Sequence, residues 1–576
     1  MPEAQNATYS TSEIRFEDNG FSAQGFVNSP RFVELDRRAS YFDCTQHDRK
    51  IYDFDGRVIQ SGKALSFQPL ISSERASWFV PLTERRPSTP YRLAKSIVGA
   101  FTNMVFGDHR FPTLRVPNDT DAQAFASAIV ASTSLPLKMI EARNHGGSTG
   151  TAGLSYCWQD GKPVIDVHNG RNLHVHEWAD FSQRIPAHVS EVYQYKVSER
   201  DPNQSSRFVE RWYWYRRDWT TDADVIFVPQ PVDVSGGKRE PMWVVDTEKS
   251  RVHNEGRCHF VWVQNLPSNE ADGECDYEGL FEQLDQIDIL YSGLMHSAKK
   301  NLDPTVVLNM DFDLVKFGVK KGSDNAIVTG VGGNAGYMET SGAWLTTGLS
   351  LFASQRSTVL EVAQCVIPDP DKLAAAGLSS VAIKAIFMLM LGKLDILRQH
   401  WGSPIVTVVS ALMDSARMAV NDFITVPQTD PVTGEIVEVE ADLVWNLPPR
   451  FEKRPVFDPE TGEQIDEQVI EIPHNPGKQN PREAKFGPYF LPTPDDRQKD
   501  VQTAQSANGG QPVLSQQTSA EYVATNTYGI DPDEEWKRIL AEKQAKKVDQ
   551  AQMFPSMGGE VENETDLPPG MAPVTE

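Results

Sequence analysis

The sequence predicts an α+β fold in which long amphipathic helices are attached to a β-rich region. Apolar residues recur at steps of three and four from Asp276 to Leu302 and again from Ala343 to Val366, as on one face of a helix. Between residues 164 and 263 the period shifts towards two, and aromatic and β-branched residues become frequent, as in strands. At 576 residues the chain exceeds one typical core, so several globular regions or one large oligomeric subunit are expected.

The first half of the chain is predicted to be mainly β, with one strong helix. Tyr91 to Phe106 follows the breakers Pro87 and Pro90 and carries apolar residues on one face, which predicts that helix. Two segments have the composition of strands, VSEVYQYKV (residues 189–197) and FVERWYWY (residues 208–215). The run from Arg211 to Arg217 could stack single-stranded bases, but alternation along a strand favours ordinary sheet packing.

The middle of the chain predicts a helix, a small β module and a second helix. The first helix would be about 40 Å long and would end at Asp303-Pro304. Short β-like segments follow at 306–308 and 314–319, and the glycine-rich passage Gly330 to Gly336 reads as a flexible loop. Two amphipathic helices in so thin a hairpin cannot cover their own apolar faces, so packing against other copies of the chain is expected.

The remainder is helical, with one β-rich insertion. Pro368 to Asp371 should end the second helix, and residues 373–413 should form another, kinked at Gly402 to Pro404. DPVTGE (residues 430–435) and DPETGE (residues 458–463) both read as hairpin turns. Residues 495–547 are helical again, and the chain from Asp549 onwards has the composition of a disordered tail.

Composition excludes several classes of protein. A formal charge of −24 and a pI near 5.0 argue against extended clamping of nucleic acid phosphates as the main task. No stretch of 18 uncharged apolar residues exists and the first 30 residues do not read as a leader, so neither membrane insertion nor secretion is indicated. Five scattered cysteines suggest free thiols in a reducing cytoplasm.

The sequence does not predict an enzyme or a cofactor. The passage Gly330 to Gly336 lacks the Lys followed by Ser or Thr of a phosphate-binding loop, which disfavours an ATP-driven motor. His168, His174 and His176, beside Glu177, have enough donors for a metal, and alternation would point His174 and His176 the same way. Surface histidines remain the preferred interpretation, and no metal site is assigned. The acidic series between Glu270 and Asp288 is either a solvated face or a like-charged wall along which DNA slides.

Three stretches, taken in their order, resemble the portal proteins of tailed double-stranded DNA phages. These are GECDYEGLFEQLDQIDILYSGLMHSAKKNLDPTVVL (273–308), PDPDKLAAAGLSSVAIK (368–384) and FGPYFLPTP (486–494). The resemblance implies the portal fold, with a β-rich wing and long stem and wing helices. Its parts would be a first wing part (1–275, with the helix 91–106), stem helix 1 (276–302), clip (303–341), stem helix 2 (342–366), tunnel loop (367–380), second wing part with the hairpin insertion (381–494), crown (495–548) and disordered tail (549–576).

The resemblance also implies a function without catalysis. About twelve copies would form a ring at one capsid vertex of the virion, assembled in the host cytoplasm, and the viral genome would be packaged and ejected through it. Expected partners are the terminase large subunit, a head-tail connector or adaptor protein, the major capsid and scaffolding proteins and double-stranded DNA, with no membrane. Expected site residues are Asp369, Asp371 and Lys372 in the tunnel loop, Glu278, Glu282, Asp285, Lys299 and Lys300 lining the stem, and Lys316, Lys320 and Lys321 in the clip.

Two other interpretations remain open. Another head-tail connector or minor capsid protein would share the acidity, the oligomerisation and the lack of catalytic motifs. A metal-dependent DNA-processing enzyme would need a carboxylate pair for magnesium, for which Asp311 and Asp313 are candidates.

Overall fold

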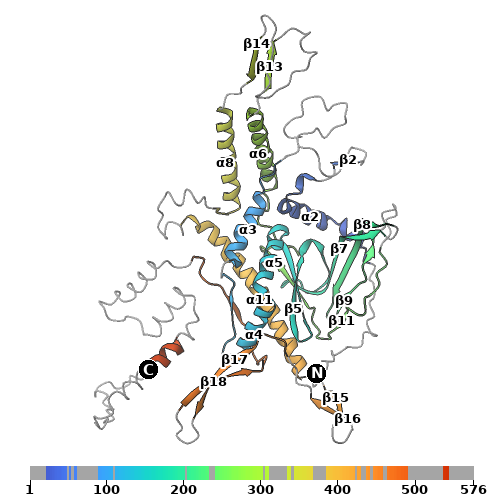
Figure 1. Ribbon diagram of the computed structural model, residues 1–576, viewed down its shortest axis with the longest axis vertical. Helices are drawn as coiled ribbons and strands as arrows, with labels where there is room; N and C mark the ends of the chain where they lie inside the picture. Colours follow the sequence, from blue (N-terminus) through green and yellow to red (C-terminus); the bar gives the residue numbers. More distant parts are fainter. Residues whose placement is uncertain are drawn as a thin grey trace, which may run out of the picture. The chain divides into compact units, whose positions relative to one another are not determined.

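The chain divides into two compact units, residues 1–486 and 487–576, and each is described by itself (Figure 1). In the second unit the structure describes residues 487–490 and a short helix at 536–543. The computed structural model describes residues 21–48, 51–52, 58–60, 89–107, 110–201, 204–232, 241–302, 305–309, 334–338, 343–367, 385–421, 425–429, 436–440, 445–457, 464–490 and 536–543.

The first unit begins with short helices whose starts are capped by side chains. Ser22 and Ser29 accept backbone N–H groups at the starts of α1 (Ala23–Val27) and α2 (Pro30–Asp43), and Asp119 does the same for α4 (Thr120–Ser132). The predicted helix at 91–106 is confirmed as α3 (Leu93–Phe106). It is followed by α5 (Leu135–Thr149), which ends at Gly150, a residue with φ of +97°.

Two antiparallel sheets form the β-rich region. The smaller has the order β12 (Phe260–Gln264), β4 (Thr151–Gln159), β5 (Lys162–Asn169). The larger has the order β11-β9-β8-β7-β6, with β10 also pairing with β8. Trp219, Phe260 and Trp262 form a buried cluster from both sheets. The strands of the larger sheet are β6 (Leu173–Asp180), β7 (Ile185–Asp201), β8 (Gln204–Trp219), β9 (Ala223–Ile226), β10 (Gln230–Pro231) and β11 (Arg251–Val252).

The predicted strands at 189–197 and 208–215 are confirmed, since they lie within β7 and β8. These two strands form one long hairpin in which Tyr193 pairs with Tyr215 and Tyr195 with Tyr213. The short pair β1 (Ile51–Tyr52) and β2 (Val58–Gln60) is separate from both sheets.

A helix, a β pair and a second helix follow, as predicted. They are α6 (Phe281–Leu302), β13 (Thr305–Asn309), β14 (Asn334–Met338) and α8 (Ala343–Val362), with the two strands antiparallel. The predicted start at Asp276 is wrong, because the chain turns at Gly279, whose φ is +72°, and the helix begins at Phe281. The glycine-rich passage is not entirely a loop, since its last residues belong to β14. The segment 314–319 lies outside the described residues.

The longest helix is α11 (Met388–Asn421), which contains Pro404. The helix continues through Gly402 to Pro404, so the chain is not interrupted there, and the predicted kink stays a prediction. The two predicted hairpins are present as the pair β15 (Thr425–Thr429) and β16 (Ile436–Glu440) and the pair β17 (Arg450–Phe457) and β18 (Gln464–Ile472), while their turns lie outside the described residues. Finally, β19 (Glu483–Lys485) pairs with β3 (Thr113–Arg115).

Candidate functional site

The helices α6 and α8 pack against each other through aromatic and small residues. The rings of Tyr91, Tyr291 and Phe352 meet, with Phe352 4.9 Å from Tyr91 and 5.4 Å from Tyr291 between ring centroids. A Cβ atom at Gly348 would lie 2.4 Å from Cδ2 of Leu294, so the absence of a side chain at Gly348 lets the helices approach closely. This contact uses one side of α8 only.

The other sides of α8 are exposed, although the helix is mainly apolar. Leu349 is 52% exposed, Leu351 49% and Val362 63%. Arg356 and Glu361 are the only charged residues in α8. An exposed helix of a monomeric protein normally carries many more charges, so this surface has the character of an interface.

Apolar side chains are also exposed at the start of α11. Leu389 is 67% exposed and Met388 66%, and Ile386 and Ile396 are also exposed. The second half of the same helix is different, because Trp401, Ile405 and Val408 are fully buried. The exposed apolar surface therefore belongs to the region around α8 and the first turns of α11, and we call it the α8–α11 apolar surface.

A buried polar junction fixes the base of α6 and the end of α8. The side chains of Arg143 and Asp276 are both 0% exposed, and Nη2 of Arg143 donates to the two carboxylate oxygens of Asp276 at 2.9 and 3.0 Å. Nζ of Lys393 donates to the carbonyls of Asp276 and Ala363, both at 3.1 Å. Burial lowers the pKa of Lys393.

Of the acidic residues expected to line the stem, Glu282 is exposed. The other two make contacts within the chain. Asp285 accepts a hydrogen bond from the Tyr41 hydroxyl at 3.0 Å, and burial raises its pKa. Glu278 accepts from Sγ of Cys275 at 3.2 Å and lies 3.3 Å from Nη2 of Arg38.

Two further members of the acidic series are buried, which the interpretation as a solvated or DNA-facing surface did not anticipate. One is Asp276, in the junction above. The other is Asp288, which accepts hydrogen bonds from the backbone N–H of Tyr91 at 2.7 Å and from Gln46 at 2.9 Å. These carboxylates attach α6 to the rest of the unit.

The remaining predicted site residues cannot be placed. The tunnel-loop residues Asp369, Asp371 and Lys372 and the clip residues Lys316, Lys320 and Lys321 lie outside the described residues, as do Asp311 and Asp313. Lys299 and Lys300 belong to α6, but the structure describes only their backbone.

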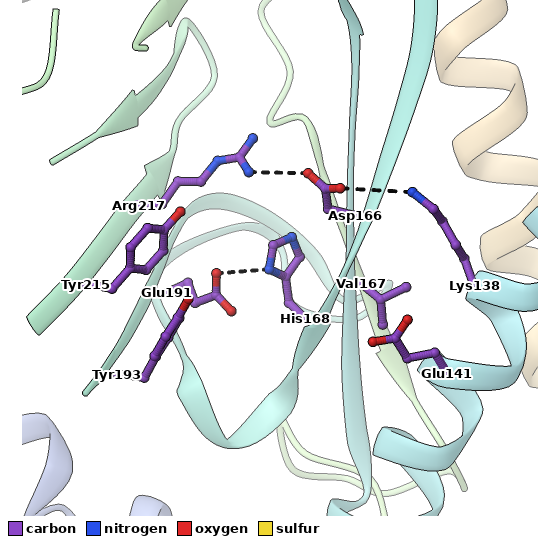
Figure 2. A pocket seen from close by; sticks show the side chains of 9 residues that line it. All are labelled: Lys138, Glu141, Asp166, Val167, His168, Glu191, Tyr193, Tyr215 and Arg217. Atoms are coloured by element: carbon purple, nitrogen blue, oxygen red, sulfur yellow. Dashed lines mark hydrogen bonds and ion pairs between the residues drawn. The ribbon is translucent and has the colours of Figure 1, made fainter. Parts of the chain in front are cut away.

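A polar cavity of about 390 Å³ lies beside the β7–β8 hairpin (Figure 2). Lys138 and Glu141 come from α5, and Asp166, Val167 and His168 from β5, while the hairpin contributes Glu191, Tyr193, Tyr215 and Arg217. Asp166 lies between two cations, 3.5 Å from Nη1 of Arg217 and 4.0 Å from Nζ of Lys138. Lys138 also donates to the carbonyl of Ile165.

His168 connects this cavity to the interior through a chain of polar contacts. Its Nδ1 lies 3.0 Å from the Glu191 carboxylate, and its Nε2 lies 2.8 Å from the Ser155 hydroxyl. The order acid, imidazole, hydroxyl resembles that of a hydrolase triad. However, Ser155 is buried and does not line the cavity, so its hydroxyl cannot meet a substrate there. The chain of contacts instead satisfies polar groups between the sheets.

His174 and His176 point the same way, as predicted, but they are half-buried and not surface residues. Their ring centroids are 4.6 Å apart, and the His176 ring stacks on His188 at 4.2 Å. Burial lowers the pKa of His174 to about 4 and that of His176 to about 3. Phe21 packs against both rings. Within the described ranges, no group of three or more His, Cys, Asp or Glu side chains lies close enough to hold a metal ion.

The aromatic run from Arg211 to Arg217 alternates between the two faces of β8, as sheet packing requires. Trp214 and Arg216 are buried, whereas Tyr213 and Tyr215 lie on the opposite face and are half-buried. Sequence reasoning did not anticipate that Tyr193 and Tyr195 of β7 would join them across the hairpin.

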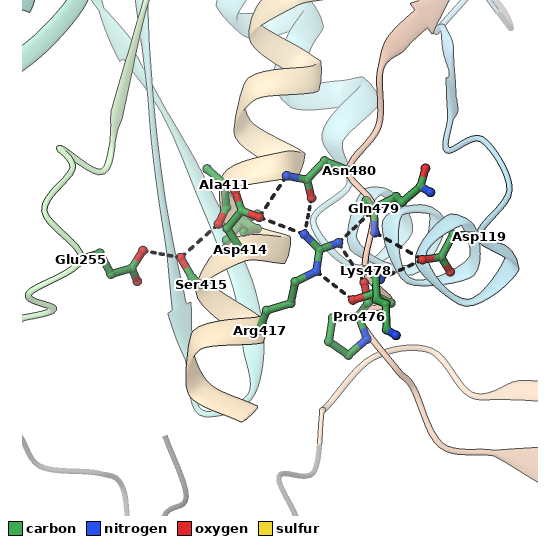
Figure 3. A network of polar contacts seen from close by, with 12 residues as sticks. Asp119, Glu255, Ala411, Asp414, Ser415, Arg417, Pro476, Lys478, Gln479 and Asn480 are labelled. Carbon is green, nitrogen blue, oxygen red and sulfur yellow. Dashed lines mark hydrogen bonds and ion pairs between the residues drawn. The ribbon is translucent and has the colours of Figure 1, made fainter. Parts of the chain in front are cut away.

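A second polar network holds the C-terminal end of α11 (Figure 3). The Arg417 guanidinium donates to the carbonyls of Pro476, Gly477 and Gln479 at 2.7 to 3.1 Å and to the Asp414 carboxylate at 2.9 Å. Asp119 accepts from the backbone N–H groups of the same loop, which ties the loop to the start of α4. The arrangement is structural, since its donors and acceptors satisfy one another.

The comparisons with known proteins give a weak structural likeness. No protein-family model and no curated protein matches the sequence. Among solved structures, the chain is similar to one from the "Virion of native gene transfer agent (GTA) particle", with 11% identity and a TM-score of 0.25 over 60% of this chain and 89% of that chain. None of the helices in the described ranges combines the length and apolar character that crossing a bilayer requires.

Proposed function

We propose that the chain is the portal subunit of a tailed double-stranded DNA phage, and that about twelve copies form a ring through which the genome passes. The α8–α11 apolar surface is the observation that carries the proposal. A single copy leaves it exposed, and in a ring of copies a different patch of the neighbouring subunit would cover it, because a ring of more than two copies closes through head-to-tail contacts. The helices α6 and α8 would then stand side by side around the axial channel.

The charge of the chain supports passage of DNA in preference to tight binding. With a formal charge of −24, the chain as a whole would repel phosphates, and exposed acidic residues such as Glu282 would discourage sticking. Within this proposal the β13–β14 pair belongs to the clip that would meet the terminase large subunit and then the connector protein. The capsid and scaffolding proteins would contact the ring from outside. The proposed role needs neither a cofactor nor catalysis.

Assembly state tests the proposal directly. The purified chain should elute as a large ring on size exclusion with light scattering, and negative-stain microscopy should show particles with a central hole. A monomer at micromolar concentration under several salt conditions would contradict the proposal. Large assemblies without an axial hole would favour the alternative of another connector or a minor capsid protein.

A variant in the apolar surface tests which helix forms the interface. Leu349→Asp should weaken the ring, because it places a charge where apolar contact is needed, while Leu137→Asp, at an exposed leucine of α5 outside this surface, is the matched control. Rings of unchanged stability in the Leu349 variant would show that α8 does not form the contact.

A further inference from the structure

The cavity beside the β7–β8 hairpin has walls of different chemistry. One wall is α5 with Glu141, the floor is β5 with Asp166, and the other wall is the hairpin with Tyr193 and Tyr215 (Figure 2). At about 390 Å³ the cavity is large enough for a small ligand or for one side chain of another protein.

The two cations of the cavity already have partners within the chain. Arg217 forms a bidentate pair with Asp224, at 2.9 and 2.7 Å, and Lys138 is held by Asp166 and by a backbone carbonyl. The two permanent cations are Lys138 and Arg217. Against them stand four carboxylates, those of Glu141, Asp166 and Glu191 in the lining and that of Asp224 behind Arg217. The cavity therefore has an excess of negative charge, and its most accessible part is Glu141, whose side chain is 61% exposed and lies 4.0 Å from Nε2 of His145.

The tyrosine side chains of the hairpin also favour a cationic ligand. The rings of Tyr193 and Tyr215 lie 4.9 Å apart across the two strands and line the cavity together. Tyr195 and Tyr213, 6.0 Å apart, continue the row along the hairpin. Faces of tyrosine rings attract cations, and the aliphatic part of a lysine or arginine side chain packs well against them.

We propose that this cavity binds the basic side chain, arginine or lysine, of a partner protein. The cationic head would lie between Glu141 and Asp166, the carboxylate of the floor, and its aliphatic stem would lie against Tyr193 and Tyr215. The row of tyrosines beyond the cavity would contact the residues on either side of that basic residue, since tyrosine supplies rigid contact area at protein interfaces. An anionic ligand would meet the excess of carboxylates and is disfavoured. The cation site would exist whether or not the chain forms rings.

Short capped peptides provide the probes, measured on the full chain by saturation-transfer NMR, which detects weak ligands of large proteins. Acetyl-Gly-Arg-Gly-amide should bind with millimolar affinity, and the Gln and Glu analogues should bind more weakly. Glu141→Gln should weaken binding of the arginine peptide about two- to fivefold, which corresponds to the loss of one partly exposed ion pair. Glu177→Gln, at an exposed position of β6 outside the cavity, is the matched control and should change nothing.

A second variant tests the aromatic wall. Tyr193→Leu should also weaken binding of the arginine peptide, with circular dichroism confirming that the sheet is retained. Equal binding of the three peptides, no saturation transfer from the arginine peptide, or an unchanged affinity in Glu141→Gln would each overturn the proposal. Microscopy of the same samples reports on ring formation separately, so failure of the cation site and failure of the proposed ring are distinguishable.

Discussion

Removing the carboxylate of Asp276 should destabilise the first unit strongly. In the native chain it accepts from Arg143 at 2.9 and 3.0 Å and from Nδ2 of Asn265 at 3.1 Å. The Nε and Nη1 atoms of Arg143 have no hydrogen-bond partner among the described residues, so its buried guanidinium depends on Asp276 for compensation. In Asp276→Ala that guanidinium stays buried without a counter-ion.

The expected loss in the free energy of unfolding is about 3 to 5 kcal/mol, the usual cost of removing one partner of a buried pair. Replacing both partners with apolar residues of similar volume, Arg143→Met with Asp276→Leu, should recover most of it, because the apolar pair carries no uncompensated charge. Urea denaturation followed by tryptophan fluorescence measures both, since the Arg143 guanidinium lies 5.9 Å from the Trp401 ring centroid.

Glu361→Ala, at an exposed position of α8, is the matched control and should change stability by no more than about 0.5 kcal/mol. The reasoning would be refuted if Asp276→Ala cost less than about 1 kcal/mol. It would also be refuted if the double variant were as unstable as the single one.

Two other perturbations have defined outcomes. Arg417→Ala should cost about 2 kcal/mol and speed tryptic cleavage after Lys478, because the loop carbonyls lose a charged donor; an unchanged cleavage rate would argue against this anchoring role. The unfolded chain protonates His174 and His176 near pH 6.5, whereas their native pKa values are about 4 and about 3, so stability should fall as the pH drops from 6.5 towards 4. Replacing both with Gln should flatten the pH dependence of urea midpoints in that window, and an unaltered slope would count against the assignment.

Periodicity predicted α3, α6, α8 and α11, but it did not predict α2, α4 or α5, and it could not show where a helix begins within an apolar pattern. Tyr277 and Leu280 continue the spacing of α6, and both are buried, yet they lie in a turn. The end was easier to predict, because Asp303-Pro304 cannot continue the helix. At Pro404 the local signal predicted a kink, and the buried side chains of Trp401, Ile405 and Val408 stabilise a helix that continues through this proline.

The acidic series shows why local pattern alone is insufficient for a site. Asp276 and Asp288 have the same charge as Glu282, but their partners, Arg143 and Tyr91, are far away in the sequence. Burial of a carboxylate depends on such distant partners, and a single sequence does not reveal them. The roles of the tunnel loop, of the clip and of the ring itself stay predictions.

The cavity beside the β7–β8 hairpin was only partly predictable from the sequence. The sequence singled out His168 and the run from Arg211 to Arg217 as candidate site residues. It did not single out Glu141 and Glu191, because these residues come from other helices and strands. The available signal was the alternation of tyrosines in both strands of the hairpin, at 193 and 195 and at 213 and 215. Since cross-strand partners share a face, two such alternating pairs predict one row of rings.

Lys393 contacts both ends of the segment that holds α6, the β13–β14 pair and α8, and this contact has an evolutionary and practical consequence. This segment begins after Asp276 and ends before Ala363, and the Lys393 amine donates hydrogen bonds to the carbonyls of both residues. The two points are therefore neighbours, so the part of the chain beyond the contacts of Tyr91 with Tyr291 and Phe352 can lengthen or shorten without changing the path of the rest of the unit. Insertions or deletions in the chain beyond Tyr291 and before Phe352 should therefore be tolerated by the rest of the unit.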